Sequence, residues 1–133
     1  MPYLIDSNLV IDLLESNPAA IQLLERLAEE GIAISIITYM EVFQGLERSS
    51  NRVEAKEKFQ TFVTSVPVLP FSLAVAERCA QLRETLRLQN KRVNARALDL
   101  VIAATALELD LTLVTRNVED FDDIPGLNFY QPS

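Results

Sequence analysis

Short apolar runs alternate along this chain with longer segments in which apolar residues recur every three or four positions. This alternation is typical of an α/β domain built on a mainly parallel sheet. The short runs predict strands at Tyr3–Ile5, Ala33–Ile36, Val68–Leu69, Thr112–Val114 and Asn128–Tyr130. We therefore expect a sheet of about four to five short strands flanked by helices.

The longer segments predict the helices. Asn17 and Pro18 are typical of a helix start, and this helix should end near Gly31. Three more helices are expected over residues 38–48, 51–65 and 72–88, followed by a basic loop over 89–94. The apolar face expected for the second of these consists of Val53, Phe59, Phe62 and Val63. A last helix, opened by Asp99, is apolar nearly all round and should lie in the core.

The length and composition set limits on this picture. A chain of 133 residues with 49% hydrophobic content can form one core, so we expect a single domain over residues 1–133. No apolar run approaches the roughly 20 residues that span a bilayer, and the amino terminus does not resemble a secretion signal. We expect a cytoplasmic protein with no membrane partner, in which the lone Cys79 is a buried structural thiol.

The absence of histidine changes the chemistry to be expected. Histidine is the commonest general base and a usual ligand of transition metals, and this chain has none. Its three glycines are isolated, so no glycine-rich phosphate loop is present. A metal bound here should be a hard cation held by oxygen atoms, chiefly Mg²⁺ or Mn²⁺.

The net charge of −7 disfavours a nucleic-acid partner, but the positive charges are unevenly spread. Half of the twelve basic residues lie between Arg78 and Arg96, with Glu84 as the only acid among them. This strip is either a solvated helix face or a surface that binds phosphates. The residues proposed for phosphate binding are Arg87, Lys91, Arg92 and Arg96, with Arg83 beside them.

Two aspartates occupy positions that favour function. Asp6 follows the first strand directly, and ligands of open α/β sheets gather at the carboxyl ends of strands. Asp6 or Ser7 could instead simply cap the next helix. Asp99 opens an apolar helix, where an unpaired charge near buried surface is costly and a metal ion would satisfy it. A structural cap is the alternative for Asp99 too.

Two further segments carry polar groups at strand ends. Thr38 and Glu41 match a helix capping box, in which Glu41 would reach back to the Thr38 amide, but Glu41 also follows a strand. Asn117 follows the fourth strand, with Asp120 shortly after it, and could be an ordinary turn residue. Together with the two aspartates, these residues predict one oxygen-rich crevice that binds a divalent cation.

Four ordered blocks resemble those of the PIN-domain family, especially its VapC toxins. They are Leu4-Ile5-Asp6-Ser7-Asn8, Thr38-x-x-Glu41-x-x-x-Gly45, Asp99 through Ala106, and Val114-Thr115-Arg116-Asn117-x-x-Asp120-Phe121. The resemblance covers nearly the whole chain. It implies a three-layer α/β fold and a Mg²⁺- or Mn²⁺-dependent ribonuclease that forms a homodimer. It also implies an antitoxin partner that can present an arginine to the acidic crevice.

By position, Asp6, Glu41 and Asp99 match the acidic triad of the family, and Asn117 stands where the wider family often has aspartate. We expect Asp6 and Asp99 to be metal ligands, Glu41 to be a ligand or a water-orienting base, and Asn117 to support them by hydrogen bonding. Asp120 is a candidate substitute for the missing acid. Ser7 keeps the hydroxyl of the threonine usual there, and the remaining supporting residues are Thr115 and Arg116.

Three other functions are weighed against this one. A phosphatase or phosphotransfer domain would use Asp6 as its nucleophile, but the dehalogenase type needs a second aspartate where Asn8 stands. A non-catalytic RNA- or partner-binding relative would be expected to have lost its acids, and three are present. An antitoxin or regulator would need a DNA-reading element, and the sequence has no such motif.

Overall fold

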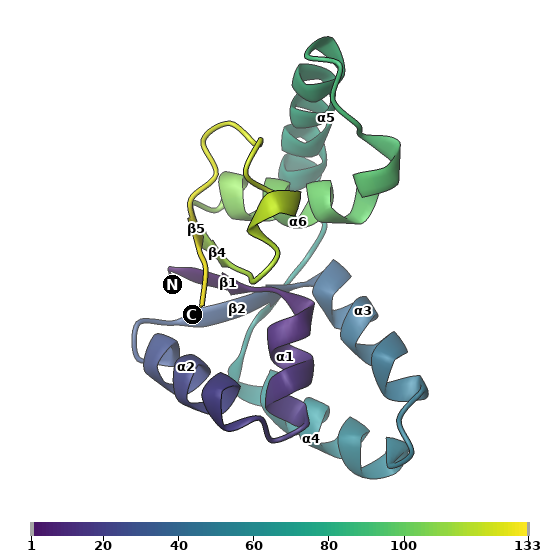
Figure 1. Cartoon of the computed structure of the whole chain (residues 1–133), viewed down its shortest axis with the longest axis vertical. Coiled ribbons are helices and arrows are strands. Elements are labelled where there is room, and N and C mark those ends of the chain that lie inside the picture. The colour runs from purple at the N-terminus through teal and green to yellow at the C-terminus, as the bar shows by residue number, and fades with distance from the viewer. Residues whose placement is uncertain (1, 133) are drawn as a thin grey trace.

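The computed structural model describes residues 2–132 and has a central parallel sheet between two layers of helices (Figure 1). The strands are β1 (Tyr3–Ile5), β2 (Ile32–Ser35), β3 (Val68–Leu69), β4 (Thr112–Val114) and β5 (Phe129–Tyr130). They lie in the order β3-β2-β1-β4-β5, and every neighbouring pair is parallel. The carboxyl ends of all five strands therefore meet along one edge, as predicted for the site.

Four helices cover one face of the sheet and two cover the other (Figure 1). The first layer contains α1 (Ser7–Leu14), α2 (Pro18–Ala28), α3 (Ile36–Glu47) and α4 (Arg52–Ser65). The second layer contains α5 (Leu73–Leu88) and α6 (Ala97–Glu108), with short 3₁₀ turns η1 (Asn94–Arg96) and η2 (Val118–Asp120) nearby. This arrangement confirms the predicted three-layer α/β fold.

Alternating side chains of the strands fill two separate cores. Leu4 and Leu113 pack toward α5 and α6, whereas Ile5 and Val114 pack toward α1 to α4. Neighbouring strand residues point to opposite faces, so a short continuous apolar run can serve both layers. Helix α6 is buried on most of its surface, as its sequence predicted, although Leu98 at its start is exposed.

Several helix boundaries follow from their capping residues. The Asn17 side chain accepts a hydrogen bond from the Ala20 amide at 3.1 Å, and Pro18 occupies the first position of α2, as predicted. Gly31 has a φ of 112°, a value that glycine adopts without steric cost, and lies between the end of α2 and β2. The Ser72 side chain caps α5 in the same manner as Asn17 caps α2.

The predicted boundary between the second strand and its helix was wrong. Helix α3 begins at Ile36 because the Ser35 side chain accepts a hydrogen bond from the Thr38 amide at 3.0 Å. Thr38 is fully buried in the first turn, and its hydroxyl accepts a hydrogen bond from that of Ser35 at 3.2 Å. The predicted capping box is therefore absent, and Glu41 is left free of that structural role.

Two smaller predictions also need correction. Val53 does not belong to the buried face of α4, because it is 75% exposed in the first turn of the helix. Asn128 lies just before β5, although its carbonyl accepts a hydrogen bond from the Leu113 amide at 2.9 Å. Cys79 is buried and unpaired, as expected. Within residues 2–132, no helix combines the length and the apolar surface needed to cross a membrane.

Candidate active site

Asp6 is held at the carboxyl end of β1 by two kinds of hydrogen bond. It is only 7% exposed and forms the N-cap of α1, where its Oδ1 atom accepts from the Ser7 amide at 2.8 Å. Its other oxygen, Oδ2, accepts from the hydroxyl of Thr115 at 2.7 Å. Asp6 is therefore the helix cap considered from the sequence, and it also lies in the predicted crevice.

Thr115 connects the ends of two neighbouring strands. It is fully buried directly after β4, and its hydroxyl oxygen accepts from the backbone amide of Asn117 at 3.0 Å while donating to Asp6. The Thr115 hydroxyl donates to Asp6 and accepts from Asn117, so its orientation is fixed. This restrains the Asp6 carboxylate. The hydrogen bond that Asn117 contributes here comes from its backbone amide.

Glu41 lies on α3, one turn beyond the buried Thr38, and is half-buried. Burial is the main reason that the pKa of Glu41 is raised above its usual value, and the charges of Asp6 and Asp99 raise it further. A hydrogen bond with the Ser7 side chain partly offsets this shift in pKa. The charges of Asp6 and Asp99 thus act on Glu41, as like charges near one another do.

Asp99 lies in the first turn of α6 and is also half-buried. Its pKa is raised first by burial, then by the charges of Asp120 and Asp6, and only partly lowered by Arg96. The N-cap of α6 is Arg96, which forms no side-chain capping bond, so Asp99 is not the N-cap of α6. A half-buried carboxylate with acidic neighbours is unfavourable without a cation.

The acidic residues match a hard divalent cation by their chemistry and charge. Within residues 2–132, no group of three Asp, Glu, Cys or His side chains is arranged so that it could hold a metal ion. Mg²⁺ retains several water ligands and is usually held by only one or two carboxylates. The charges of Asp6 and Asp99 each raise the pKa of Glu41, and that of Asp6 also raises the pKa of Asp99.

The basic strip is only partly available to a ligand. Arg87 forms two hydrogen bonds with Glu84, at 2.8 and 2.7 Å, on the exposed side of α5. Arg96 forms two with Asp123, at 2.9 and 2.7 Å, and Lys91 lies 3.9 Å from the same carboxylate. In the described part of the chain, Arg92 forms no ion pair. Phosphate groups of a ligand would therefore compete with acids of the protein for most of this strip.

Two arginines near the site form ion pairs with acids that were not predicted from the sequence. Asp12 on α1 pairs with Arg116, which follows Thr115 at the end of β4. Asp123 pairs with Arg96, whose Nη2 atom donates both to Asp123 Oδ1 at 2.7 Å and to the Asp120 carbonyl at 2.8 Å. Both pairs join residues far apart in the sequence, so spacing along the chain gave no signal for them.

The sequence also matches a known family. The sequence pattern of the PIN-domain family matches residues 3–127, nearly the whole chain. The chain belongs to this family. Ribonuclease VapC2 of Rickettsia felis is 30% identical over 129 residues, covering 96% of this chain and 95% of that protein. The tRNA(fMet)-specific endonuclease VapC of Shigella flexneri is 28% identical over 127 residues, with the same coverage of both chains.

Solved structures support the same assignment. A chain of the DNA-bound VapBC complex from Salmonella typhimurium matches with a TM-score of 0.87 and 26% identity, covering 100% of this chain and 99% of that one. A chain of the promoter-bound VapBC2 complex from Rickettsia felis matches with a TM-score of 0.86 and 27% identity, covering 98% of both. Within the PIN-domain family, this chain is VapC-like, which confirms the resemblance found in its sequence motifs.

Proposed function

We propose that this chain is a ribonuclease that uses Mg²⁺ or Mn²⁺ to cleave RNA phosphodiester bonds as the toxin of a toxin–antitoxin pair. The observation that carries the proposal is the group of half-buried acids at the carboxyl edge, in which Glu41 and Asp99 have raised pKa values. The names of the VapC relatives as ribonucleases support the choice of RNA as substrate. We further propose that the chain acts as one domain, in the cytoplasm.

The roles of the residues follow from their surroundings. Asp6 and Asp99 would hold the metal ion, with Asp6 oriented by the hydroxyl of Thr115. When bound, the ion supplies Lewis-acid chemistry: it lowers the pKa of a water molecule and neutralises charge on the phosphate. Asn117 supports the arrangement by positioning Thr115.

Glu41 is suited either to bind the ion or to orient the attacking water. A carboxylate with an ordinary pKa is a weak base at neutral pH, and burial beside Asp6 raises the pKa of Glu41, which makes it a stronger base. Ser7 limits this rise in the pKa of Glu41, and its hydroxyl donates to Asp6 Oδ1 at 3.5 Å. An ionised Glu41 can therefore orient the attacking water through a hydrogen bond or accept a proton from it, and accepting the proton leaves Glu41 neutral.

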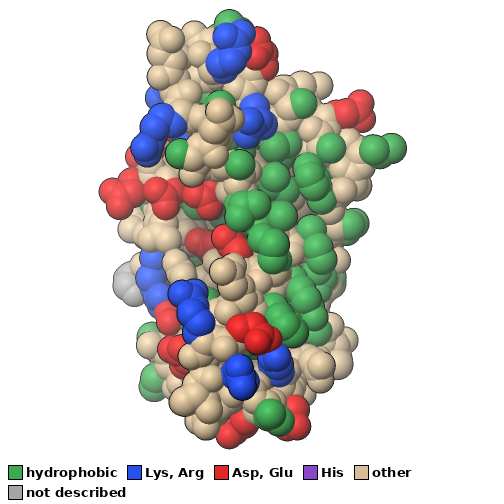
Figure 2. Space-filling model, turned by 90° about the vertical axis from the view of Figure 1, so that its right-hand side faces the viewer, with side chains coloured by type: hydrophobic (Ala, Val, Ile, Leu, Met, Phe, Trp, Pro, Cys, Tyr) green, Lys and Arg blue, Asp and Glu red, His purple; other side chains and the backbone are tan. Residues whose placement is uncertain are grey.

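Two protein partners belong to the proposal. The related chains occur in VapBC complexes, and an acidic crevice complements an arginine offered by an antitoxin. A homodimer is supported by exposed apolar residues on α3, Ile36 and Met40, with Leu98 at the start of α6. Figure 2 looks onto the side of the molecule that carries α3, and hydrophobic side chains gather there in a band. Gel filtration of the purified chain should give the mass of a dimer.

The test of the function is a cleavage assay on the chain purified with its adjacently encoded partner and then released from it. RNA should be cut with Mg²⁺ or Mn²⁺ and remain intact with EDTA, and small phosphomonoesters should not be hydrolysed. Hydrolysis of the phosphomonoesters alone would favour the phosphatase alternative. RNA binding without cleavage under any metal condition would favour a non-catalytic relative.

A further inference from the structure

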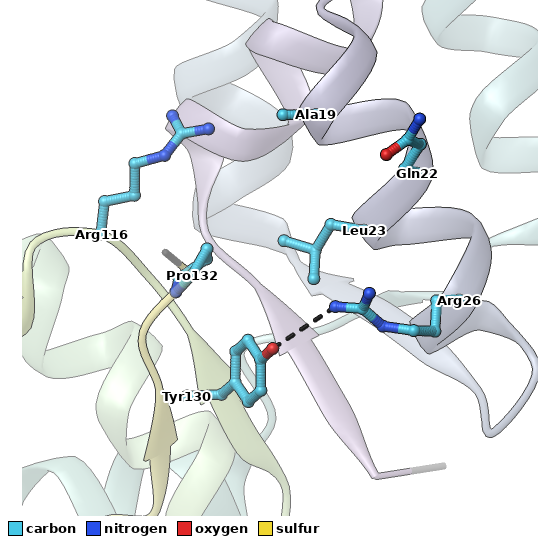
Figure 3. Close-up of a pocket in the computed structure, with 7 residues that line it drawn as sticks. All are labelled: Ala19, Gln22, Leu23, Arg26, Arg116, Tyr130 and Pro132. Carbon is cyan, nitrogen blue, oxygen red and sulfur yellow. Dashed lines mark hydrogen bonds between the residues drawn. The ribbon is translucent and has the colours of Figure 1, made fainter.

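A pocket next to the end of β4 is lined by two arginines, Arg26 and Arg116, and the proposed function gives the pocket no role. It lies between helix α2 and strand β5, and Figure 3 shows the side chains that surround it. Its polar lining consists of Gln22, Arg26, Arg116 and Tyr130, and Leu23 and Pro132 supply apolar surface. The pocket thus offers both positive charge and apolar surface. A ligand with an anionic part and a flat apolar part would match it.

The two arginines come from different elements, and their guanidinium groups lie at opposite ends of the group of residues drawn in Figure 3. Arg26 comes from the last turn of α2, and Arg116 comes from the segment that follows β4 (Figure 3). Arg26 forms no ion pair with any residue in the range 2–132; its hydrogen-bond partner is the Tyr130 hydroxyl, at 3.4 Å. Arg116 is paired with Asp12, but its side chain remains 41% exposed. Guanidinium groups bind phosphate oxygens through paired hydrogen bonds.

The pocket is joined to the proposed active site through the sheet. Tyr130 is the register partner of Val114, and its carbonyl accepts a hydrogen bond from the Thr115 amide at 3.1 Å. Thr115 in turn donates to the Asp6 carboxylate. A chain of nucleotides leaving the crevice past β4 would therefore meet Arg116 first and the rest of the pocket next.

The ring of Tyr130 offers a surface for a base. Tyr130 is 38% exposed, and its hydroxyl is occupied by Arg26, which restrains the orientation of the ring. Single-stranded RNA is bound in many proteins by stacking unpaired bases on aromatic rings while arginines hold the backbone. The arginine pair and the aromatic ring together favour a nucleotide over a peptide carboxylate, which would use only the charges.

We propose that this pocket binds one nucleotide of single-stranded RNA next to the cleaved bond, with the phosphates on its two sides held by Arg26 and Arg116 and its base on Tyr130. The inference rests on the proposed ribonuclease function and adds a substrate-binding subsite to it. It also explains how a chain of net charge −7 holds RNA beside an acidic crevice. The local positive charge offsets the repulsion of phosphate that the whole molecule produces.

Binding is measured first, apart from cleavage, with the Asp99→Asn chain and a fluorescein-labelled single-stranded oligoribonucleotide of mixed sequence. Adding Arg26→Ala should weaken binding about tenfold, the loss typical of a charge-assisted hydrogen bond. It should also reduce the slope of log affinity against log salt by about 0.7, the value for one phosphate contact in a single strand. Arg52→Ala, which removes an exposed arginine at the start of α4, is the matched control and should change neither quantity.

The base contact has its own test. Tyr130→Ala should weaken binding about tenfold without changing the salt slope, because stacking carries no net charge. Tyr130→Phe keeps the ring and should bind within about threefold of the parent. In the cleavage-competent chain, Arg26→Ala should raise KM while kcat stays close to that of the wild type.

Two results would overturn the subsite and leave the ribonuclease function standing. One is a wild type that cleaves RNA while the Arg26 and Tyr130 variants bind and cleave as it does. The other is unchanged RNA binding in these variants together with weakened binding of the partner protein, which would assign the pocket to protein docking. A wild type that neither binds nor cuts RNA would overturn the proposed function itself.

Discussion

Two aspartates on either side of the same arginine have opposite electrostatic environments. Asp123 accepts two hydrogen bonds from Arg96, and this contact is the main reason that its pKa is lowered. Asp99, three residues after Arg96, forms no ion pair within residues 2–132, and burial raises its pKa. Arg96 is thus paired with Asp123 and offsets only part of the unfavourable charge of Asp99.

The direction of the pKa shift divides the acids into two groups. A lowered pKa marks a charge that is favourable in the folded state, and a raised pKa marks one that is unfavourable there. Glu84 follows the pattern of Asp123, since its arginine neighbour, Arg87, lowers its pKa. Glu41 follows the pattern of Asp99, with burial and acidic neighbours raising its pKa. Groups whose charge is unfavourable in the folded state are candidates for function, because an external cation or a substrate proton can satisfy them. Each prediction below tests one side of this contrast.

The largest effect is expected from Asp99→Asn. This variant should fold normally and lose RNA cleavage by at least about 100-fold, the scale lost when one key transition-state interaction is removed. The matched control is Asp110→Asn, which makes the same chemical change at an exposed residue after the same helix. Cleavage rates with Mg²⁺ decide the matter, with circular dichroism to show that both variants are folded. Equal activity in the two variants would show that Asp99 takes no part in cleavage.

The second effect concerns the metal ion and pH. A divalent ion that binds only the folded chain at 100 times its Kd should raise the free energy of unfolding by about 2.7 kcal/mol. Thermal unfolding with Mn²⁺ and with EDTA measures this increment, which should be strongly reduced in Asp99→Asn. If Asp99→Asn keeps the full metal-dependent rise in the free energy of unfolding, the ion binds elsewhere.

The pH dependence without metal has a defined sign. The folded chain binds protons at Asp99 and Glu41 more tightly than the unfolded chain does, because both pKa values are raised. Their contribution to stability is therefore fully favourable below the unfolded pKa values, about 4, and is lost as pH rises through the folded values. In EDTA, Asp99→Asn should lose less stability than the wild type over this range, and a parallel pair of curves would contradict the raised pKa.

Much of this arrangement followed from the sequence because it depends on local patterns. The strands, the start of α2 and the position of Asp6 after β1 are each specified by neighbouring residues. The boundary at Ile36 was missed because Ser35 and Thr38 are both good capping residues, and only the buried hydrogen bond between them decides which one caps. The partners of Arg96 and Arg116 were missed because the fold, and not chain spacing, brings Asp123 and Asp12 to them.

A third prediction addresses the paired aspartate. Asp123→Asn should lower the free energy of unfolding by about 1 to 2 kcal/mol at neutral pH, since Arg96 is only 13% exposed and would lose its charged partner. The lowered pKa of Asp123 means that its contribution is present above the unfolded pKa, about 3.9, and is lost as pH falls through the folded value. The difference from the wild type in urea unfolding should therefore shrink in acid.

The exposed pair of Glu84 and Arg87 provides the control for that measurement. Glu84→Gln removes a contact of similar geometry on the surface of α5, where solvent screens the charges, and should change stability little. Cleavage should fall far less in Asp123→Asn than in Asp99→Asn. An Asp123 variant with wild-type stability would show that the two hydrogen bonds with Arg96 do not stabilise the fold.

The smallest effect is expected from Asp120→Asn, which tests whether an exposed acid takes part in the crevice. Among the neighbouring charges, that of Asp120 contributes most to the raised pKa of Asp99, ahead of Asp6, although Asp120 itself lies on the surface at the end of η2. Removing it should lower the pKa of Asp99, slightly stabilise the metal-free chain at neutral pH, and reduce the Mn²⁺ increment by about 0.5 kcal/mol, the scale of a screened surface charge. Asp122→Asn, an exposed aspartate two residues further on, is the control, and thermal unfolding with Mn²⁺ and with EDTA compares the two. If their increments are equal, Asp120 does not substitute for the acid that Asn117 replaces, and the site relies on Asp6, Glu41 and Asp99 alone.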